Sequence, residues 1–172
     1  MAEPESVERI ADALEAVLVE LIDGHEKLVA LCVAKRSALS AAQHDRVAEI
    51  LGRENDRVQQ ISELEKQRLR LGGELTLALD PAAAAPMRLR QLAERCDEPR
   101  RGRLLVLRQT LEARMRSASN EMKVARRATE ALVRHMQGIV QTINSACAGA
   151  GVYGRPGTAS APTALSTFNT TA

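Results

Sequence analysis

Apolar residues recur with helical spacing through most of this 172-residue chain. Two series at intervals of seven run through the first 40 residues: Ile10, Val17, Gly24 and Leu31, with the companions Leu14, Leu21, Leu28 and Lys35. Apolar residues spaced alternately by three and four lie on one helix face and form a coiled-coil seam. The pattern slips at Ser40, where Ser40 and Gln43 resemble a weak capping box, so we expect a turn at about 40–43.

A second helix is expected to follow this turn and to run to about Leu79, with Glu54 and Arg68 interrupting its apolar stripe. The two helices together predict an αα-hairpin. Prolines then break the chain, because proline is excluded from helix interiors. Residues 87–96 are expected to form a short helix with Pro86 at its first position.

The last helix has the most regular period and is expected to span about residues 100–147. Two interleaved series define it: Leu104, Leu111, Ala118, Ala125, Leu132, Ile139 and Ala146, and Met115, Met122, Thr129, Met136 and Ile143. Such a helix would be roughly 70 Å long, which predicts an elongated molecule. The expected fold is all-α: an elongated antiparallel helical bundle or coiled-coil hairpin of three long helices and one short helix. Its helical domain is expected at 4–148. The Gly-, Ala-, Ser- and Thr-rich residues 149–172 predict a disordered tail.

Composition supports helices and is unfavourable for two other classes. The only aromatic residues are Tyr153 and Phe168, so neither a β-sandwich core nor a surface that stacks bases is expected. The net charge is +2, but residues 1–80 carry 16 acidic and 10 basic residues, whereas residues 87–134 carry 6 and 13. We therefore expect the last helix to pack along the acidic hairpin. Nucleic-acid binding through the arginines from Arg88 to Arg134 is the competing hypothesis.

The candidate chemistry is sparse. Three widely spaced cysteines without a CxxC motif predict neither disulfides nor a zinc site. His25, His44 and His135 lack metal-ligand spacing, and no nucleophile or phosphate-loop motif is present, so we expect no enzyme, no cofactor and no metal. The acidic N-terminus does not resemble a signal peptide, and no apolar run reaches membrane-spanning length, which predicts a cytoplasmic protein without membrane insertion.

The longest helix is expected to present apolar surface that its own chain cannot cover. Its methionines suit irregular partners, although core packing is the alternative for any one of them. The uncovered stretch predicts a partner, either a second copy in a homodimer or another protein's helix. The candidate stripe is Leu104, Leu107, Leu111, Met115, Met122, Leu132, Met136 and Ile139.

The order of these parts resembles the FlgN family of flagellar type III export chaperones. The resemblance covers about residues 7–157. It rests on the Leu14, Leu21, Leu28 and Lys35 heptads, on Glu54 followed by Arg68, on Asn120 in the last helix, and on Tyr153-Gly154-Arg155-Pro156-Gly157 in the tail. Lys123 departs from the family, which has a second Asn at that position.

This resemblance implies a chaperone that binds the C-terminal helices of the hook–filament junction proteins, which are hook-associated proteins. It would prevent their premature assembly and deliver them to the export gate. The stripe would then hold the client helix. The resemblance also implies that Tyr153 contacts the cytoplasmic ring of the gate; packing of Tyr153 back on the bundle is the alternative. A self-associating adaptor coiled coil without a client is the competing function.

Overall fold

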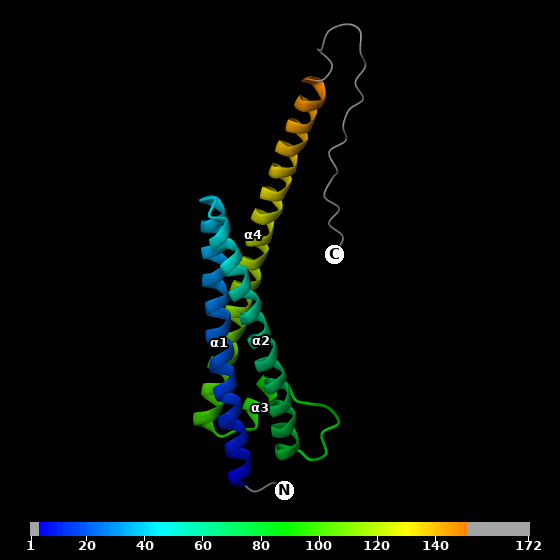
Figure 1. Cartoon of the computed structure of the whole chain (residues 1–172). Coiled ribbons are helices and arrows are strands. Elements are labelled where there is room, and N and C mark those ends of the chain that lie inside the picture. Colours follow the sequence, from blue (N-terminus) through cyan, green and yellow to red (C-terminus); the bar gives the residue numbers. More distant parts are fainter. Residues whose placement is uncertain (1–3, 151–172) are drawn as a thin grey trace, which may run out of the picture. The chain divides into compact units, whose positions relative to one another are not determined.

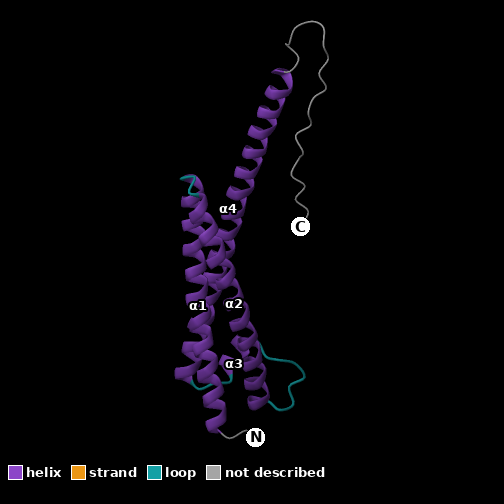
Figure 2. Cartoon of the chain, in the orientation of Figure 1, coloured by secondary structure: helices purple, strands orange, loops and turns teal. Residues whose placement is uncertain are grey.

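The computed structural model describes residues 4–150, and side chains for residues 5–148, as four helices (Figure 1, Figure 2). They are α1 (Pro4–Ser40), α2 (His44–Leu79), α3 (Leu89–Glu94) and α4 (Glu98–Ala150). No strand occurs within residues 4–150. The expected all-α class, with three long helices and one short helix, is confirmed. Nearly all of the predicted tail lies outside the described residues.

The chain divides into two compact units, residues 1–128 and residues 129–172, with the boundary inside α4. In the first unit, the α4 series Leu104, Leu111, Ala118 and Ala125 is buried at every position. In the second unit, α4 residues 129–148 are exposed except for the half-buried Leu132. Across the described range, no helix is both long enough and apolar enough to cross a membrane.

The turn between α1 and α2 falls where the slip of the heptad pattern predicts it. Ser40 is the last residue of α1, and its hydroxyl donates to the Ser37 carbonyl at 2.9 Å. The predicted capping box is therefore absent, and Gln43 precedes α2 without a side-chain capping bond. Ala42 has φ of 52°, in the left-handed region that commonly ends a helix. The turn is made by backbone geometry rather than by the expected side chains.

The connection from α2 to α3 is tied down by a buried threonine. Thr76 donates its hydroxyl to the Gly72 carbonyl at 2.7 Å and accepts the Met87 backbone N–H at 3.0 Å. Arg88 is extended, with φ of −69° and ψ of 152°, so α3 begins at Leu89. The prediction of a helix from Met87 with Pro86 at its first position is therefore wrong. Thr76 holds the Met87 backbone outside the helix.

The core of the first unit is almost entirely aliphatic. Its large, fully buried leucines come from all four helices: Leu14, Leu18 and Leu21 of α1, Leu75 of α2, Leu92 of α3 and Leu104 of α4. Burying a leucine side chain contributes about 1.5–3 kcal/mol. This cluster holds the first turns of α4 against the α1–α2 hairpin and closes the end of the bundle that contains α3.

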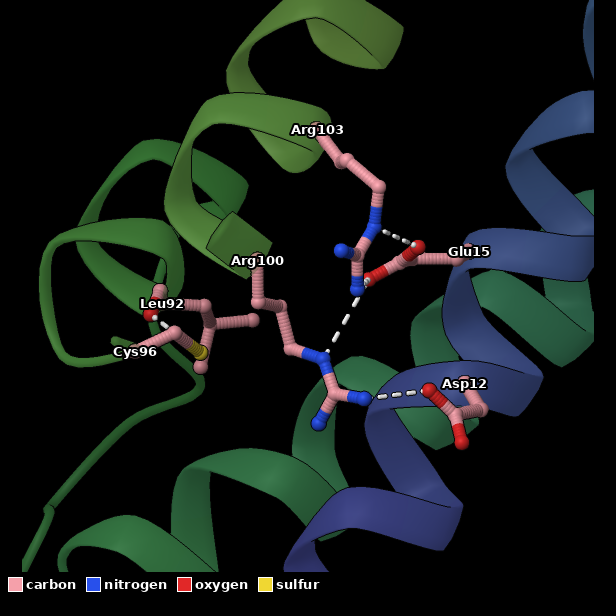
Figure 3. A network of polar contacts seen from close by, with 6 residues as sticks. All are labelled: Asp12, Glu15, Leu92, Cys96, Arg100 and Arg103. Atoms are coloured by element: carbon pink, nitrogen blue, oxygen red, sulfur yellow. Dashed lines mark hydrogen bonds and ion pairs between the residues drawn. The ribbon is translucent and has the colours of Figure 1, made fainter. Parts of the chain in front are cut away.

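Ion pairs reinforce this packing beside the leucine core. Arg100 reaches both Asp12 and Glu15, and Arg103 donates two bonds to Glu15 at 2.9 and 3.1 Å (Figure 3). The side chains of Arg100 and Glu15 are only 15% and 17% exposed, so water screens their attraction less than at an open surface. The predicted packing of the basic α4 segment along acidic α1 is confirmed here.

Further pairs give the helix directions within the first unit. Arg114 pairs with Glu26 at 2.6 Å, and Glu121 pairs with Arg36 at 2.8 Å. Residue numbers therefore rise together along α1 and α4, so the two helices run in the same direction. Between α1 and α2, Lys35 pairs with Glu54 while Gly24 lies against Ile61, so residue numbers run oppositely and α2 is antiparallel to both.

Candidate binding groove

A groove with a volume of about 540 Å³ opens among α1, α2 and α4 of the first unit. We call it the three-helix groove. It is lined by His25, Leu28 and Lys35 of α1, by Glu54, Asn55 and Val58 of α2, and by Met115, Ala118, Ser119, Met122, Lys123 and Arg126 of α4.

The groove exposes apolar side chains between two helix walls. Leu28 and Ala118 are buried, and they line the groove from α1 and α4. Val58 on α2 and Met115 and Met122 on α4 are 42–45% exposed. A groove of this kind fits the apolar face of an amphipathic helix, because such a helix inserts side chains spaced by three and four residues.

One end of the groove is held by a buried ion pair. Lys35 on α1 contacts Glu54 on α2, and their side chains are only 13% and 11% exposed. Cys32, fully buried, donates its thiol to the other Glu54 oxygen at 3.3 Å. Burial, followed by this hydrogen bond to Glu54, raises the pKa of the Cys32 thiol to about 11. The cluster fixes the α1–α2 spacing and provides no reactive thiolate at neutral pH.

His25 contributes a neutral ring to the groove lining. Both its ring nitrogens are buried without a hydrogen-bond partner among the described residues. Burial lowers the pKa of His25, and the negative charge of Glu65 opposes this shift only partly. The imidazole therefore stays uncharged at neutral pH and behaves as an apolar lining residue.

The α4 wall carries the positive charge of the groove. Lys123 and Arg126 line it beside Ser119. On the α2 wall, Glu54 is the charged residue, and Lys35 neutralises it. The α4 wall therefore presents two cationic side chains to the groove.

The structure divides the predicted stripe of α4 into core and groove positions. Leu104 and Leu111 are buried in the core, and Leu107 packs half-buried against it. Met115 and Met122 line the three-helix groove. The same heptad pattern thus holds α4 to the bundle near its start and presents apolar surface one to three turns later.

The remaining stripe residues lie in the second unit. Leu132 is half-buried, whereas Met136 and Ile139 are 51% and 46% exposed. A shallow hollow of about 490 Å³ lies on this segment, lined by Arg134, His135, Gly138, Ile139, Thr142 and Ile143. Tyr153 lies outside the described residues.

Other groove residues were not singled out as binding residues by the sequence patterns. Leu28 and Val58 belong to the apolar stripes of their helices, which do not distinguish a groove position from a core position. The sequence patterns did not predict His25 or Asn55 as binding residues either. The sequence signal that could have indicated the groove was the interruption of the apolar stripe of α2 at Glu54, because Glu54 lies at the charged end of the groove.

The residues that carry the family resemblance have different surroundings. Lys35 and Glu54 form the buried pair, and Arg68 pairs with Glu65 of its own helix at 2.8 Å. Asn120 is exposed on α4.

Taken together, the bundle and its apolar groove define a helical binding protein. Within residues 4–150, no group of three or more His, Cys, Asp or Glu side chains could hold a metal ion. A family model described as FlgN protein matches residues 10–161, and the chain belongs to the FlgN family. This is a family of flagellar export chaperones that bind hook-associated proteins. The comparisons with curated proteins and with solved structures returned no match.

Proposed function

We propose that this chain is a cytoplasmic export chaperone for the C-terminal helices of hook–filament junction proteins. It binds these helices before export, prevents their premature assembly, and delivers them to the type III export gate. The observation that carries the proposal is the three-helix groove, where Val58, Met115 and Met122 remain 42–45% exposed around buried Leu28.

A client helix would complete the bundle at this groove. An amphipathic helix that is separated from its assembly partners exposes an apolar face, and such faces associate nonspecifically. Covering Val58, Met115 and Met122 removes apolar surface from water on both partners, at about 25 cal/mol per Å². Ordering the client segment costs about 2–5 kcal/mol of the gross binding energy, which keeps the complex releasable at the gate.

We also propose client contacts on the second unit, considered by itself. Met136 and Ile139 are exposed there, and Leu132 is half-buried on the same helical stripe. Leu104, Leu107 and Leu111 support the groove by holding α4 on the bundle, since Leu104 and Leu111 are buried.

Export-gate binding is proposed for Tyr153. In the sequence, Tyr153 follows the last residue of α4 by three positions and is separate from the groove residues. Replacement of Tyr153 with alanine is expected to retain client binding and to lose binding to the cytoplasmic ring of the gate. Equal loss of both activities in pull-down experiments would contradict this separation.

A self-associating adaptor is the second candidate function. It is favoured by the exposed apolar side chains at Val133, Met136, Ile139, Val140 and Ile143, which could pair with a second copy. Light scattering over a range of concentrations separates the two functions. A stable dimer that client does not dissociate would support the adaptor.

The test of the chaperone function uses matched aspartate variants. Met122→Asp in the groove is expected to abolish co-purification of a hook-associated client, and Met136→Asp is expected to weaken it. Val106→Asp is the control, because Val106 is 62% exposed on the same helix and lines none of the described grooves. Unchanged capture by a helical Met122→Asp protein would remove the groove from the client site. Equal loss with Val106→Asp would indicate a nonspecific effect.

A further inference from the structure

The three-helix groove lies where the aliphatic core of the first unit ends. On α4, the core cluster contains buried Leu104 and Leu111. Beyond Leu111, the buried side chains of α4 in the described range are Ala118 and Ala125, and neither belongs to this cluster. A leucine side chain removes much more apolar surface from water than the methyl group of alanine does. Burial therefore holds α4 to the bundle less tightly along the groove than along the core.

Two ion pairs join the groove part of α4 to α1. We call residues 114–126 the groove segment, because they include all six α4 residues that line the groove. Arg114 pairs with Glu26 at 2.6 Å, and these side chains are 47% and 48% exposed. Glu121 pairs with Arg36 at 2.8 Å, and about a third of each side chain is exposed. Water screens the attraction in such pairs, so each contributes little to stability.

The start of α4 is anchored more firmly. In residues 98–111, which we call the core segment, Leu104 and Leu111 pack in the aliphatic cluster. Arg100 also reaches Glu15 there, with both side chains mostly buried. Local opening of a folded protein costs the least free energy where few apolar contacts are broken. The groove segment is therefore expected to detach more readily than the core segment of the same helix.

We propose that the groove segment of α4 is a movable wall, which detaches from α1 and returns while the core segment stays in place. Met115 and Met122 move with it, because both belong to this segment. Detachment widens the groove and admits an occupant helix between the wall and Val58 of α2. The movement is a property of the free chain. Its role in client entry rests on the proposed function.

Hydrogen exchange of the full chain, followed by NMR, measures the opening of each segment. A stretch of helix that leaves its packing surface is only marginally stable in water, so its backbone hydrogen bonds open and its amides exchange. We expect protection factors in the groove segment to be about 10-fold lower than in the core segment. Equal protection of the two segments would overturn the inference.

Paired substitutions test whether the ion pairs hold the wall. Glu26→Gln/Glu121→Gln removes both pairs and should raise exchange about 5-fold in the groove segment while leaving the core segment unchanged. Glu49→Gln/Glu63→Gln is the matched control, because it makes the same change in net charge at two exposed pairs within α2 and should alter neither segment. Equal effects of the two double variants would overturn the inference. Faster exchange throughout α1 would also overturn it, because the whole bundle would then be opening.

Adding a client peptide separates this inference from the proposed function. The C-terminal helical segment of a hook-associated protein should slow exchange in the groove segment. If the free chain shows the expected difference and the client changes nothing, the movable wall stands and the client site in the groove is wrong. If the two segments are equally protected in the free chain and the client still protects the groove segment, the client site stands and the movable wall is wrong.

Discussion

The buried Lys35–Glu54 pair provides the sharpest test of how the groove is held open. Replacing Lys35 with methionine retains most of the side-chain volume but leaves Glu54 with the Cys32 thiol as its one donor among the described residues. Because the two side chains are 13% and 11% exposed, the carboxylate that remains is poorly hydrated. Removing one partner of a buried ion pair costs about 3–5 kcal/mol when burial is complete.

We expect Lys35→Met to lower the free energy of unfolding by about 3 kcal/mol, toward the lower part of that range because some exposure remains. A loss of this size lowers Tm by roughly 6–12 °C for a domain of this length. The double variant Lys35→Met/Glu54→Leu should recover a large part of the loss, because no unpaired charge is left in the interior.

Urea unfolding followed by circular dichroism at the helix band measures these free energies. Lys66→Met is the matched control, since the Lys66–Glu63 pair is 71% and 61% exposed and should contribute under about 0.5 kcal/mol. If Lys35→Met costs no more than Lys66→Met, or if the double variant is less stable than Lys35→Met, the assignment of this pair as the clamp between α1 and α2 is refuted.

Two further substitutions and one labelling experiment test other parts of the structure. His25→Leu should raise the free energy of unfolding by about 1 kcal/mol, because leucine leaves no unpartnered buried nitrogens. Since the folded-state pKa of His25 is lowered, the unfolded chain binds its proton first, so wild-type stability should fall as pH drops through about 6.5 and His25→Leu should weaken that fall in urea titrations. Alkylation at pH 8 followed by mass spectrometry should label exposed Cys147 rapidly and Cys32 only after unfolding, because Cys32 is buried with its pKa raised to about 11. Thr76→Val should cost about 1–2 kcal/mol in urea unfolding, since the Met87 N–H loses its acceptor.

The helices could be predicted from the sequence because aliphatic heptads and proline-free intervals determine where long helices run. The turn at 40–43 followed from the slip in that pattern. The predicted capping residues were wrong, because the backbone conformation of Ala42 forms the turn without a capping bond from Ser40. The start of α3 was also missed, since it depends on the Thr76 hydroxyl, which is 11 residues away from Met87.

The candidate site was predicted only in part, for a related reason. Leu111 and Met115 occupy the same apolar stripe of α4, but α1 and α2 cover the first and leave the second exposed. Heptad spacing predicts the apolar stripe of a helix, but it does not predict which residues of the stripe the neighbouring helices bury. Burial of each stripe residue depends on how the helices are aligned. Ion pairs such as Arg114–Glu26, which link residues 88 positions apart, set this alignment.

Methionine methyl NMR tests the central claim most directly, because the chain has only five methionines and three of them have well-defined, different surroundings. Met115 and Met122 line the groove, whereas Met87 packs half-buried against the core. Adding the C-terminal helical segment of a hook-associated protein should shift the methyl signals of Met115 and Met122 and leave that of Met87 in place. A saturating client that shifts Met87 alone, or that leaves Met115 and Met122 unchanged, would contradict a client site in the three-helix groove.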